Sequence, residues 1–218
     1  MKTSLRILIS DKLGEVSAEM VQPEKMKALL VLAHGAGAGM NHSFMIQLSD
    51  ALSEQGIGSL RYNFPYMENG KKRPDPPAIA TKAVQQALDK AHTLLPGTPI
   101  LAGGKSFGGR MTTQYLSKTP VDFVKGIILF GFPLHPAGAP ATERAEHLKS
   151  ITHPMLFLQG TRDALAELSL MEGVISELSY ASLVKFQNAD HSFKSGKKDF
   201  VPELALAARE WMDKIVSS

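Results

Sequence analysis

The sequence predicts an α/β fold of three layers, in which a mostly parallel sheet of eight strands is covered by helices on both faces. Short apolar segments rich in β-branched residues alternate with longer amphipathic segments along the chain, a pattern typical of strands alternating with helices. The length of 218 residues suits one domain with a continuous core. No repeat or low-complexity tail divides the chain. We therefore expect a single domain over residues 1–218.

Eight segments have the length and apolar character of strands: residues 5–9, 15–20, 28–33, 57–61, 100–102, 126–130, 155–158 and 182–186. The first two are expected to form an antiparallel hairpin, and the others to run parallel. Helices are expected at residues 42–55, 77–95, 106–117, 141–150, 164–177 and 202–216. Two loops rich in Pro and Gly, residues 62–76 and 132–140, follow carboxyl ends of strands, where ligands bind in open α/β sheets. Neither is long enough for a large helical lid, so we expect an open cleft with little or no lid.

The composition excludes several classes of protein. The chain has no cysteine, which excludes disulfides, thiolate metal sites and a cysteine nucleophile and agrees with a cytoplasmic location. Apolar residues 7–9 are followed at once by Asp11 and Lys12, so neither a signal peptide nor a membrane span is expected there. The formal charge is only +3, and the short basic runs lack interleaved aromatic residues. We expect no nucleic-acid partner and no membrane partner; the oligomeric state stays open.

The most informative motif is GGKSFGGR at residues 103–110, which places Ser106 in Gly-x-Ser-x-Gly between an apolar segment and a predicted helix. A sharp strand-to-helix turn strains the serine backbone and brings other segments close, so glycine is needed on either side, here at Gly104 and Gly108. Such a turn presents the serine as a nucleophile; a flexible glycine turn is the alternative. The same letters resemble the end of a phosphate-binding loop, but that motif needs a glycine where Pro99 stands.

A serine hydroxyl needs a base within hydrogen-bond reach and an acid that orients the base. In enzymes with a serine on this kind of turn, the acid and then the histidine follow the serine along the chain. His191, in the segment NADHSF, is the only histidine that follows every plausible acid. Asp163, directly after the apolar strand in LFLQGTRD, is the predicted acid, with helix capping as its alternative role. Asp190 competes, but as the neighbour of His191 it is expected to shape the turn instead.

Acyl transfer also needs hydrogen-bond donors directed at the developing oxyanion. The backbone N–H of Phe107, which follows the serine, is one predicted donor. The second is expected in the segment HGAGAGM after the strand at residues 28–33, where we favour the N–H of Ala36, with Gly37 close behind. Gly37 is therefore also predicted to lie against the substrate. Phe64 and Tyr66, in the loop at residues 62–76, are predicted substrate contacts, with core packing as the alternative.

These motifs together resemble the α/β-hydrolase superfamily over nearly the full chain: HGAGAG after an early strand, GKSFGG at the turn, GTRD after a later strand and DHSF near the end. The chain is most similar to the dienelactone-hydrolase-like branch, and within it to small bacterial predicted hydrolases related to a subunit of a human histone-acetyltransferase complex, which share blocks like RYNFPY and GGKSFGGR. The resemblance implies an eight-stranded, mostly parallel sheet and a catalytic triad of Ser106, Asp163 and His191. Dienelactone hydrolases carry a cysteine where this chain has Ser106, so their substrate is not implied here.

The sequence therefore predicts a serine hydrolase that acts on small carboxylic esters through an acyl-enzyme and needs no cofactor or metal. A thioesterase or a peptidase would use the same residues. The alternative from a different class is a non-catalytic binding or scaffold protein of the same fold, which the kinship with a complex subunit motivates. Lys105 and Arg110 would favour an acidic substrate, although a structural ion pair is the alternative role for Arg110.

Overall fold

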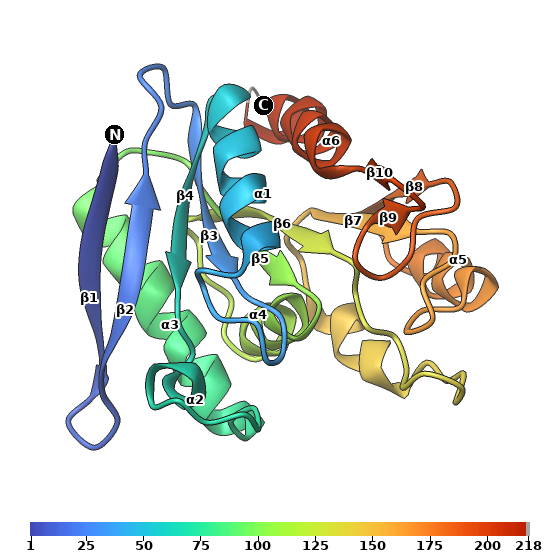
Figure 1. The fold of residues 1–218 in the computed structure, drawn as a ribbon, viewed down its shortest axis with the longest axis horizontal. Helices are drawn as coiled ribbons and strands as arrows, with labels where there is room; N and C mark the ends of the chain where they lie inside the picture. Colours follow the sequence, from blue (N-terminus) through green and yellow to red (C-terminus); the bar gives the residue numbers. More distant parts are fainter. Residues whose placement is uncertain (217–218) are drawn as a thin grey trace.

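An eight-stranded sheet forms the centre of the computed structural model, which describes residues 1–216 (Figure 1). Its strands lie in the order β1-β2-β4-β3-β5-β6-β7-β8. Their bounds are β1 Lys2–Ser10, β2 Gly14–Val21, β3 Ala28–Ala33, β4 Ile57–Tyr62, β5 Ile100–Lys105, β6 Val124–Phe130, β7 Met155–Gly160 and β8 Ala181–Phe186. All the predicted strands are present, and most extend further than predicted.

The directions of the strands also agree with the prediction. β1 pairs with β2 antiparallel, and neighbouring strands from β4 across to β8 pair parallel. β2 joins the rest of the sheet antiparallel, with Ala18 opposite Tyr62 of β4. Every residue of β3, β5 and β7 is buried, because the central strands of a parallel sheet are covered on both faces.

Helices cover both faces of this sheet. On one face, α1 (Ser43–Glu54) and α6 (Val201–Val216) share an apolar cluster with the sheet. On the other face, α3 (Pro77–Leu94), α4 (Phe107–Leu116) and α5 (Leu168–Ser176) contribute to a second cluster. The predicted three-layer architecture is therefore present, with the sheet as its middle layer (Figure 1).

Two predicted helices differ from what the structure contains. The helix predicted at residues 141–150 is a 3₁₀ helix, η1 (Glu143–Ser150). The helix predicted from residue 164 begins only at Leu168, as α5. The residues before it form a turn in which the N–H of Leu165 donates to the carboxylate of Asp163. This contact is an Asx turn, in which the side chain of Asp163 holds the backbone that precedes α5.

Two short elements were not predicted. A helix of one turn, α2 (Pro65–Glu68), lies in the loop after β4. A small hairpin, β9 (Lys194–Ser195) with β10 (Lys198–Asp199), lies between β8 and α6. In residues 1–216, the helical segments between β4 and β5 are α2 and α3, and the one between β6 and β7 is η1.

No helix within residues 1–216 is both long and apolar enough to cross a bilayer.

Candidate active site

Ser106 lies at a sharp turn between β5 and α4. Its backbone has φ 51° and ψ −115°, and a positive φ is rare for a residue other than glycine. Its N–H donates to the carbonyl of Phe130 at the end of β6, with an N···O distance of 3.1 Å. A Cβ at Gly108 would stand 2.5 Å from the carbonyl oxygen of Ala33 in β3. Helix α4 can therefore begin this close to β3 only with a glycine at that position.

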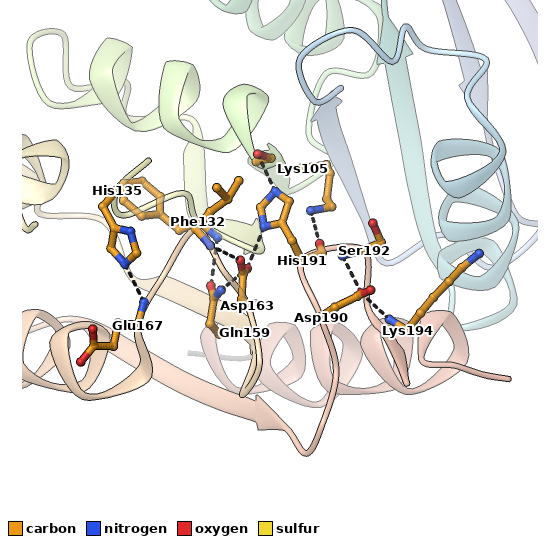
Figure 2. Close-up of polar contacts among 12 residues, drawn as sticks. Lys105, Phe132, His135, Gln159, Asp163, Glu167, Asp190, His191, Ser192 and Lys194 are labelled. Carbon is orange, nitrogen blue, oxygen red and sulfur yellow. Dashed lines mark hydrogen bonds and ion pairs between the residues drawn. The ribbon is translucent and has the colours of Figure 1, made fainter. Parts of the chain in front are cut away.

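Hydrogen bonds join Ser106, His191 and Asp163 in a chain, of which Figure 2 labels the histidine and the aspartate. The Nε2 atom of His191 lies 2.9 Å from Oγ of Ser106, and its Nδ1 atom lies 2.7 Å from Oδ2 of Asp163. The three residues follow β5, β8 and β7, so the carboxyl edge of the sheet brings them together. Because an ionised carboxylate only accepts hydrogen bonds, Nδ1 carries the proton and Nε2 is the acceptor that faces the serine hydroxyl.

The carboxylate of Asp163 is buried and has donors on both oxygens. Its side chain is 0% exposed. Besides the imidazole, Oδ2 accepts from Nε2 of Gln159 at 2.6 Å, and Oδ1 accepts from the N–H of Leu165 at 2.8 Å. Gln159 is held in turn by the N–H of Phe132, which donates to its Oε1 at 3.0 Å (Figure 2). These donors satisfy a carboxylate that burial would otherwise disfavour, and they hold it toward the imidazole.

The structure favours neither Asp190 as the acid nor helix capping as the role of Asp163. Oδ1 of Asp190 accepts from the N–H groups of Ser192 and Lys194, at 2.8 and 2.9 Å. Asp190 therefore shapes the turn that carries His191, as its position predicts. Asp163 does not cap α5, because that helix begins after Glu167 with no side-chain cap.

The two predicted oxyanion donors come from segments next to Ser106. Phe107 is the first residue of α4, and Ala36 follows Gly35, where an added Cβ would lie 3.8 Å from the Cβ of Ser106. Within residues 1–216, neither the Phe107 N–H nor the Ala36 N–H donates to a protein acceptor. The Gly37 N–H does, since it bonds the hydroxyl of Tyr66 at 2.9 Å. Ala36 is thus better placed than Gly37 to supply a donor.

His34 fixes the glycine-rich loop that carries Ala36. It is fully buried, its Nδ1 lies 2.8 Å from the carbonyl of Gly35, and its Nε2 lies 3.1 Å from the N–H of Phe64. Burial lowers the pKa of His34 to about 4. The ring is therefore neutral near pH 7, with Nδ1–H donating to the carbonyl and Nε2 accepting from the amide. The first letter of HGAGAG is a structural histidine.

A cavity of about 680 Å³ opens beside Ser106 and His191. Phe44 and Leu165 give its wall apolar surface, and Lys105, Asp190, Lys194 and Asp199 give it charged groups. A cavity of this size accommodates a small organic ligand.

The predicted substrate contacts Phe64 and Tyr66 lie in the core and not in the wall of this cavity. They are 0% and 1% exposed. The ring of Phe64 packs edge to face against Phe107, with centroids 5.3 Å apart, and Tyr66 holds Gly37 through its hydroxyl. We therefore assign both aromatic residues to packing behind the glycine-rich loop, because burial removes them from contact with a ligand.

Charged groups near the site also differ from expectation. Arg110, one turn along α4 from Ser106, has no carboxylate within ion-pair distance among residues 1–216. Burial, together with the nearby charge of Arg144, lowers the pKa of Arg110. No group of three His, Asp or Glu side chains in the described part of the chain is arranged to hold a metal ion.

Comparison with known proteins decides the family. Residues 26–213 match the family model described as "Alpha/beta hydrolase domain". The chain belongs to this alpha/beta hydrolase family. The predicted fold class, a mostly parallel eight-stranded sheet between helices, is thereby confirmed together with the observed topology.

Solved structures with the same fold include esterases and hydrolases. This alpha/beta hydrolase is similar to dienelactone hydrolase from Anabaena variabilis, with 17% identity, a TM-score of 0.79 and coverage of 99% of this chain and 98% of that chain. It is similar to Est1E from Butyrivibrio proteoclasticus, with 15% identity, a TM-score of 0.76 and coverage of 99% of each chain. A curated relative, probable cutinase 1 from Aspergillus niger, is 38% identical over 88 residues. That match spans 38% of this chain and only 32% of the relative.

Two residues that support the site of this hydrolase were not predicted to do so. Gln159 is a single amide in the buried strand MLFLQG, and a polar side chain in such a strand needs a partner. That signal was present in the sequence, but it does not name Asp163 as the partner. Lys105 was connected with acidic substrates, whereas in the structure its Nζ donates to the carbonyl of His191 at 2.6 Å (Figure 2).

Proposed function

We propose that this alpha/beta hydrolase cleaves small carboxylic esters, with Ser106 as nucleophile, His191 as general base and acid, and Asp163 as the residue that orients the imidazole. The observation that carries the proposal is the continuous hydrogen-bonded chain from Oδ2 of Asp163 through the imidazole to Oγ of Ser106, with steps of 2.7 and 2.9 Å. A serine in contact with the unprotonated nitrogen of an oriented histidine is an activated nucleophile.

Acylation begins when Oγ of Ser106 attacks the ester carbonyl carbon and its proton moves to Nε2 of His191. The carbonyl oxygen becomes an oxyanion, which the N–H groups of Phe107 and Ala36 stabilise. The imidazolium is stabilised by the buried carboxylate of Asp163. When the tetrahedral intermediate collapses, the ester C–O bond breaks, the alcohol leaves with the proton from Nε2, and the acyl group stays on Oγ.

Deacylation repeats the sequence with water. Nε2 takes a proton from the water, whose oxygen attacks the acyl carbon. Collapse of the second intermediate returns the proton to Oγ of Ser106 and releases the carboxylic acid. All the groups required for both half-reactions belong to this chain, so the proposal needs neither cofactor nor metal.

The cavity supports a small substrate. Its volume of about 680 Å³ and its apolar surface at Phe44 and Leu165 suit an acyl or alcohol group of modest size. The names of the solved neighbours, which include an esterase domain from a Rhodothermus marinus protein and a dienelactone hydrolase, agree with ester chemistry but come from proteins that share only the fold with this chain.

The test is hydrolysis of p-nitrophenyl acyl esters of increasing chain length by the wild type and Ser106→Ala, with fluorophosphonate labelling of both. We expect the variant to lose both labelling and turnover, with kcat below about one thousandth of the wild-type value. Ser117→Ala, at the other end of α4, is the control and should keep both. The chain-length profile then measures the acyl pocket.

Each other outcome points to a different function. Undiminished hydrolysis by Ser106→Ala overturns the role of the serine. If the protein is labelled but does not hydrolyse the esters, the same test is repeated with thioesters and peptide anilides, because their hydrolysis would use the same three side chains. If a correctly folded wild type is neither labelled nor active, the proposal passes to a non-catalytic binding or scaffold member of the fold. The resemblance of RYNFPY and GGKSFGGR to relatives of a histone-acetyltransferase complex subunit is then the starting point for a search for its partner.

A further inference from the structure

Lys105 is a buried lysine that the proposed reaction does not use. It is the last residue of β5, directly before Ser106, and is 9% exposed. Burying an ammonium group is costly unless it is paired. Among residues 1–216, however, no carboxylate lies within ion-pair distance of its Nζ atom. The ammonium group beside the nucleophile therefore loses hydration without gaining an ion pair, and other contacts must offset that cost.

The contacts of the ammonium group offset that cost. Its Nζ atom donates to the carbonyl oxygen of His191 at 2.6 Å, and it lies 5.3 Å from the ring centroid of Phe193 and 5.9 Å from that of Phe44. Aromatic faces attract a cation, and a charged donor makes a stronger hydrogen bond to a carbonyl than a neutral one. The ammonium group is thus directed at the backbone of the residue that carries the imidazole.

The turn around His191 needs such a contact. Local bonds shape it, from the Asp190 N–H to the Lys194 carbonyl at 2.9 Å and from the Phe193 N–H to the Asp190 carbonyl at 3.0 Å. Its two ends are tied elsewhere, because the carbonyl of Ala189 accepts from the Arg162 N–H at 2.9 Å and that of Phe193 from the Phe200 N–H at 3.2 Å. Phe193 has a positive φ of 59°, a conformation that a bulky residue adopts only when its surroundings enforce it. Within residues 1–216, the hydrogen bond from Lys105 is the one that holds the peptide group of His191 to the rest of the molecule.

These contacts close a ring. Ser106 is covalently joined to Lys105, the ammonium group of Lys105 bonds the carbonyl of His191, and the imidazole of His191 bonds Oγ of Ser106. The nucleophile and the anchor of its base therefore sit on one rigid strand end. Any movement of the histidine turn away from β5 must break the bond from Lys105 as well as the bond from Ser106.

We propose, building on the proposed ester hydrolysis, that Lys105 is a positioning residue that holds the imidazole of His191 against Ser106 through its hydrogen bond to the His191 carbonyl. Asp163 orients the ring, and Lys105 fixes the backbone from which the ring extends. Removing this hydrogen bond changes none of the residues Ser106, Asp163 and His191, but it allows the imidazole of His191 to move away from the hydroxyl of Ser106.

The test is Lys105→Met, which keeps an unbranched side chain against Phe44 and Phe193 but removes the donor. We expect kcat for a p-nitrophenyl ester to fall about 10- to 100-fold, the cost of a small misplacement of a catalytic group, with KM changed less than about twofold and fluorophosphonate labelling slowed by the same factor as kcat. Lys105→Arg restores a charged donor and should recover part of the loss. Lys125→Met is the matched control, because Lys125 also donates to a backbone carbonyl, that of Asp122, on the exposed start of β6.

The pH profile separates positioning from packing. Desolvation lowers the pKa of Lys105 to about 8, against the opposing charges of Asp163 and Asp190. The other charged or titratable groups in the cavity around it are His42, His191, Lys194 and Asp199. As pH rises through about 8, the ammonium group loses its charge and its hydrogen bond weakens, so wild-type kcat should fall toward the level of Lys105→Met. The variant should lack this alkaline decline.

A readout that does not require turnover keeps this proposal distinct from the proposed function. The Nδ1 proton of His191, bonded to Asp163 at 2.7 Å, should give a downfield proton resonance that His191→Ala removes and Lys105→Met shifts or broadens. If the wild type is inactive but the resonance responds to Lys105→Met, positioning stands and ester hydrolysis fails. An unchanged resonance with unchanged kcat in Lys105→Met overturns the positioning role, as does a rise in KM alone, which would make Lys105 a substrate-binding residue.

Discussion

At the scale of the single residue, Ser106 combines a strained backbone with a hydrogen bond to the imidazole of His191. Its φ of 51° and ψ of −115° lie outside the regions that residues with a Cβ prefer. The conformation points the side chain toward the imidazole while the backbone N–H stays bonded to Phe130. A strained residue of this kind costs about 1–3 kcal/mol, which the surrounding structure must offset.

Replacing the serine tests that strain. Ser106→Gly and Ser106→Ala both lack Oγ, but only glycine adopts this conformation without cost. We expect the free energy of unfolding of Ser106→Gly to exceed that of Ser106→Ala by about 1 kcal/mol, after allowing for the greater freedom of glycine in the unfolded chain. Urea unfolding of both variants measures the difference. At Ser117, which has φ −68°, the order should be reversed, and a less stable glycine variant at both positions would rule out strain at Ser106.

The sequence predicts some of the contacts in this region and not others. The chain order of serine, acid and histidine, together with strand ends at one edge, points to Ser106, Asp163 and His191, and the structure brings these three within hydrogen-bond distance of one another. The roles of Phe64 and Tyr66 depended on which way a loop folds. Their burial follows from α2, a single helical turn that the letters around Pro65 did not reveal. The contact between Lys105 and His191 joins residues 86 positions apart, and composition carries no information about such a pair.

At the scale of the elements, the approach of α4 to β3 decides whether the turn can form. The same limit applies at two glycines of the motif, since a Cβ at Gly104 or at Gly108 would stand 2.5 Å from the carbonyl oxygen of Ala33. The strand pairing that creates this approach, β3 beside β5, joins segments that are distant in the chain. The sequence motif predicts that the turn needs glycine at both positions. It does not predict that the carbonyl of Ala33 is the atom that comes close, because that depends on the order of strands in the sheet.

Two helical glycines therefore respond in opposite ways to the same substitution. Gly108→Ala forces a methyl group against backbone and should lower the free energy of unfolding by about 2 kcal/mol or more, as overpacking does. Gly173→Ala, in α5, places its methyl group where no atom lies within 4 Å, so it should raise stability by about 0.5–1 kcal/mol. Denaturant unfolding of both variants is the measurement. Equal effects at the two sites would mean that propensity, and not close approach, governs position 108.

At the scale of the whole molecule, three titratable groups with shifted pKa values make stability depend on pH. His34 is held neutral in the core, and the pKa of His147 is lowered to about 4 by burial and the nearby charge of Arg110. Glu68 acts in a lower range. Burial would raise its pKa, but hydrogen bonds from Asn63, Ser17 and Arg6 lower it to about 2. These groups lie in different parts of the chain, and protonating any of them in the folded state lowers the free energy of unfolding of the whole domain.

The sign of the histidine effect follows from linkage. Between pH 6.5 and about 4, histidines of the unfolded chain bind protons that His34 and His147 of the folded chain do not. The free energy of unfolding must therefore fall as pH falls through this range. Below pH 4.5 the carboxylate of Glu68 adds a further loss, because protonation removes the charge that its donors stabilise.

His147→Gln isolates one part of this dependence. Nε2 of His147 lies 2.8 Å from the hydroxyl of Thr113, and a glutamine amide can supply a similar donor without titrating. We expect the free energy of unfolding of the variant, measured in urea from pH 7.5 to 4, to fall less steeply below pH 6.5 than that of the wild type. Above pH 7 the two proteins should differ by a constant amount, since the imidazole is then neutral in both the folded and the unfolded state. Parallel curves down to pH 4 would show that His147 accepts a proton while folded, and that its surroundings do not keep it neutral.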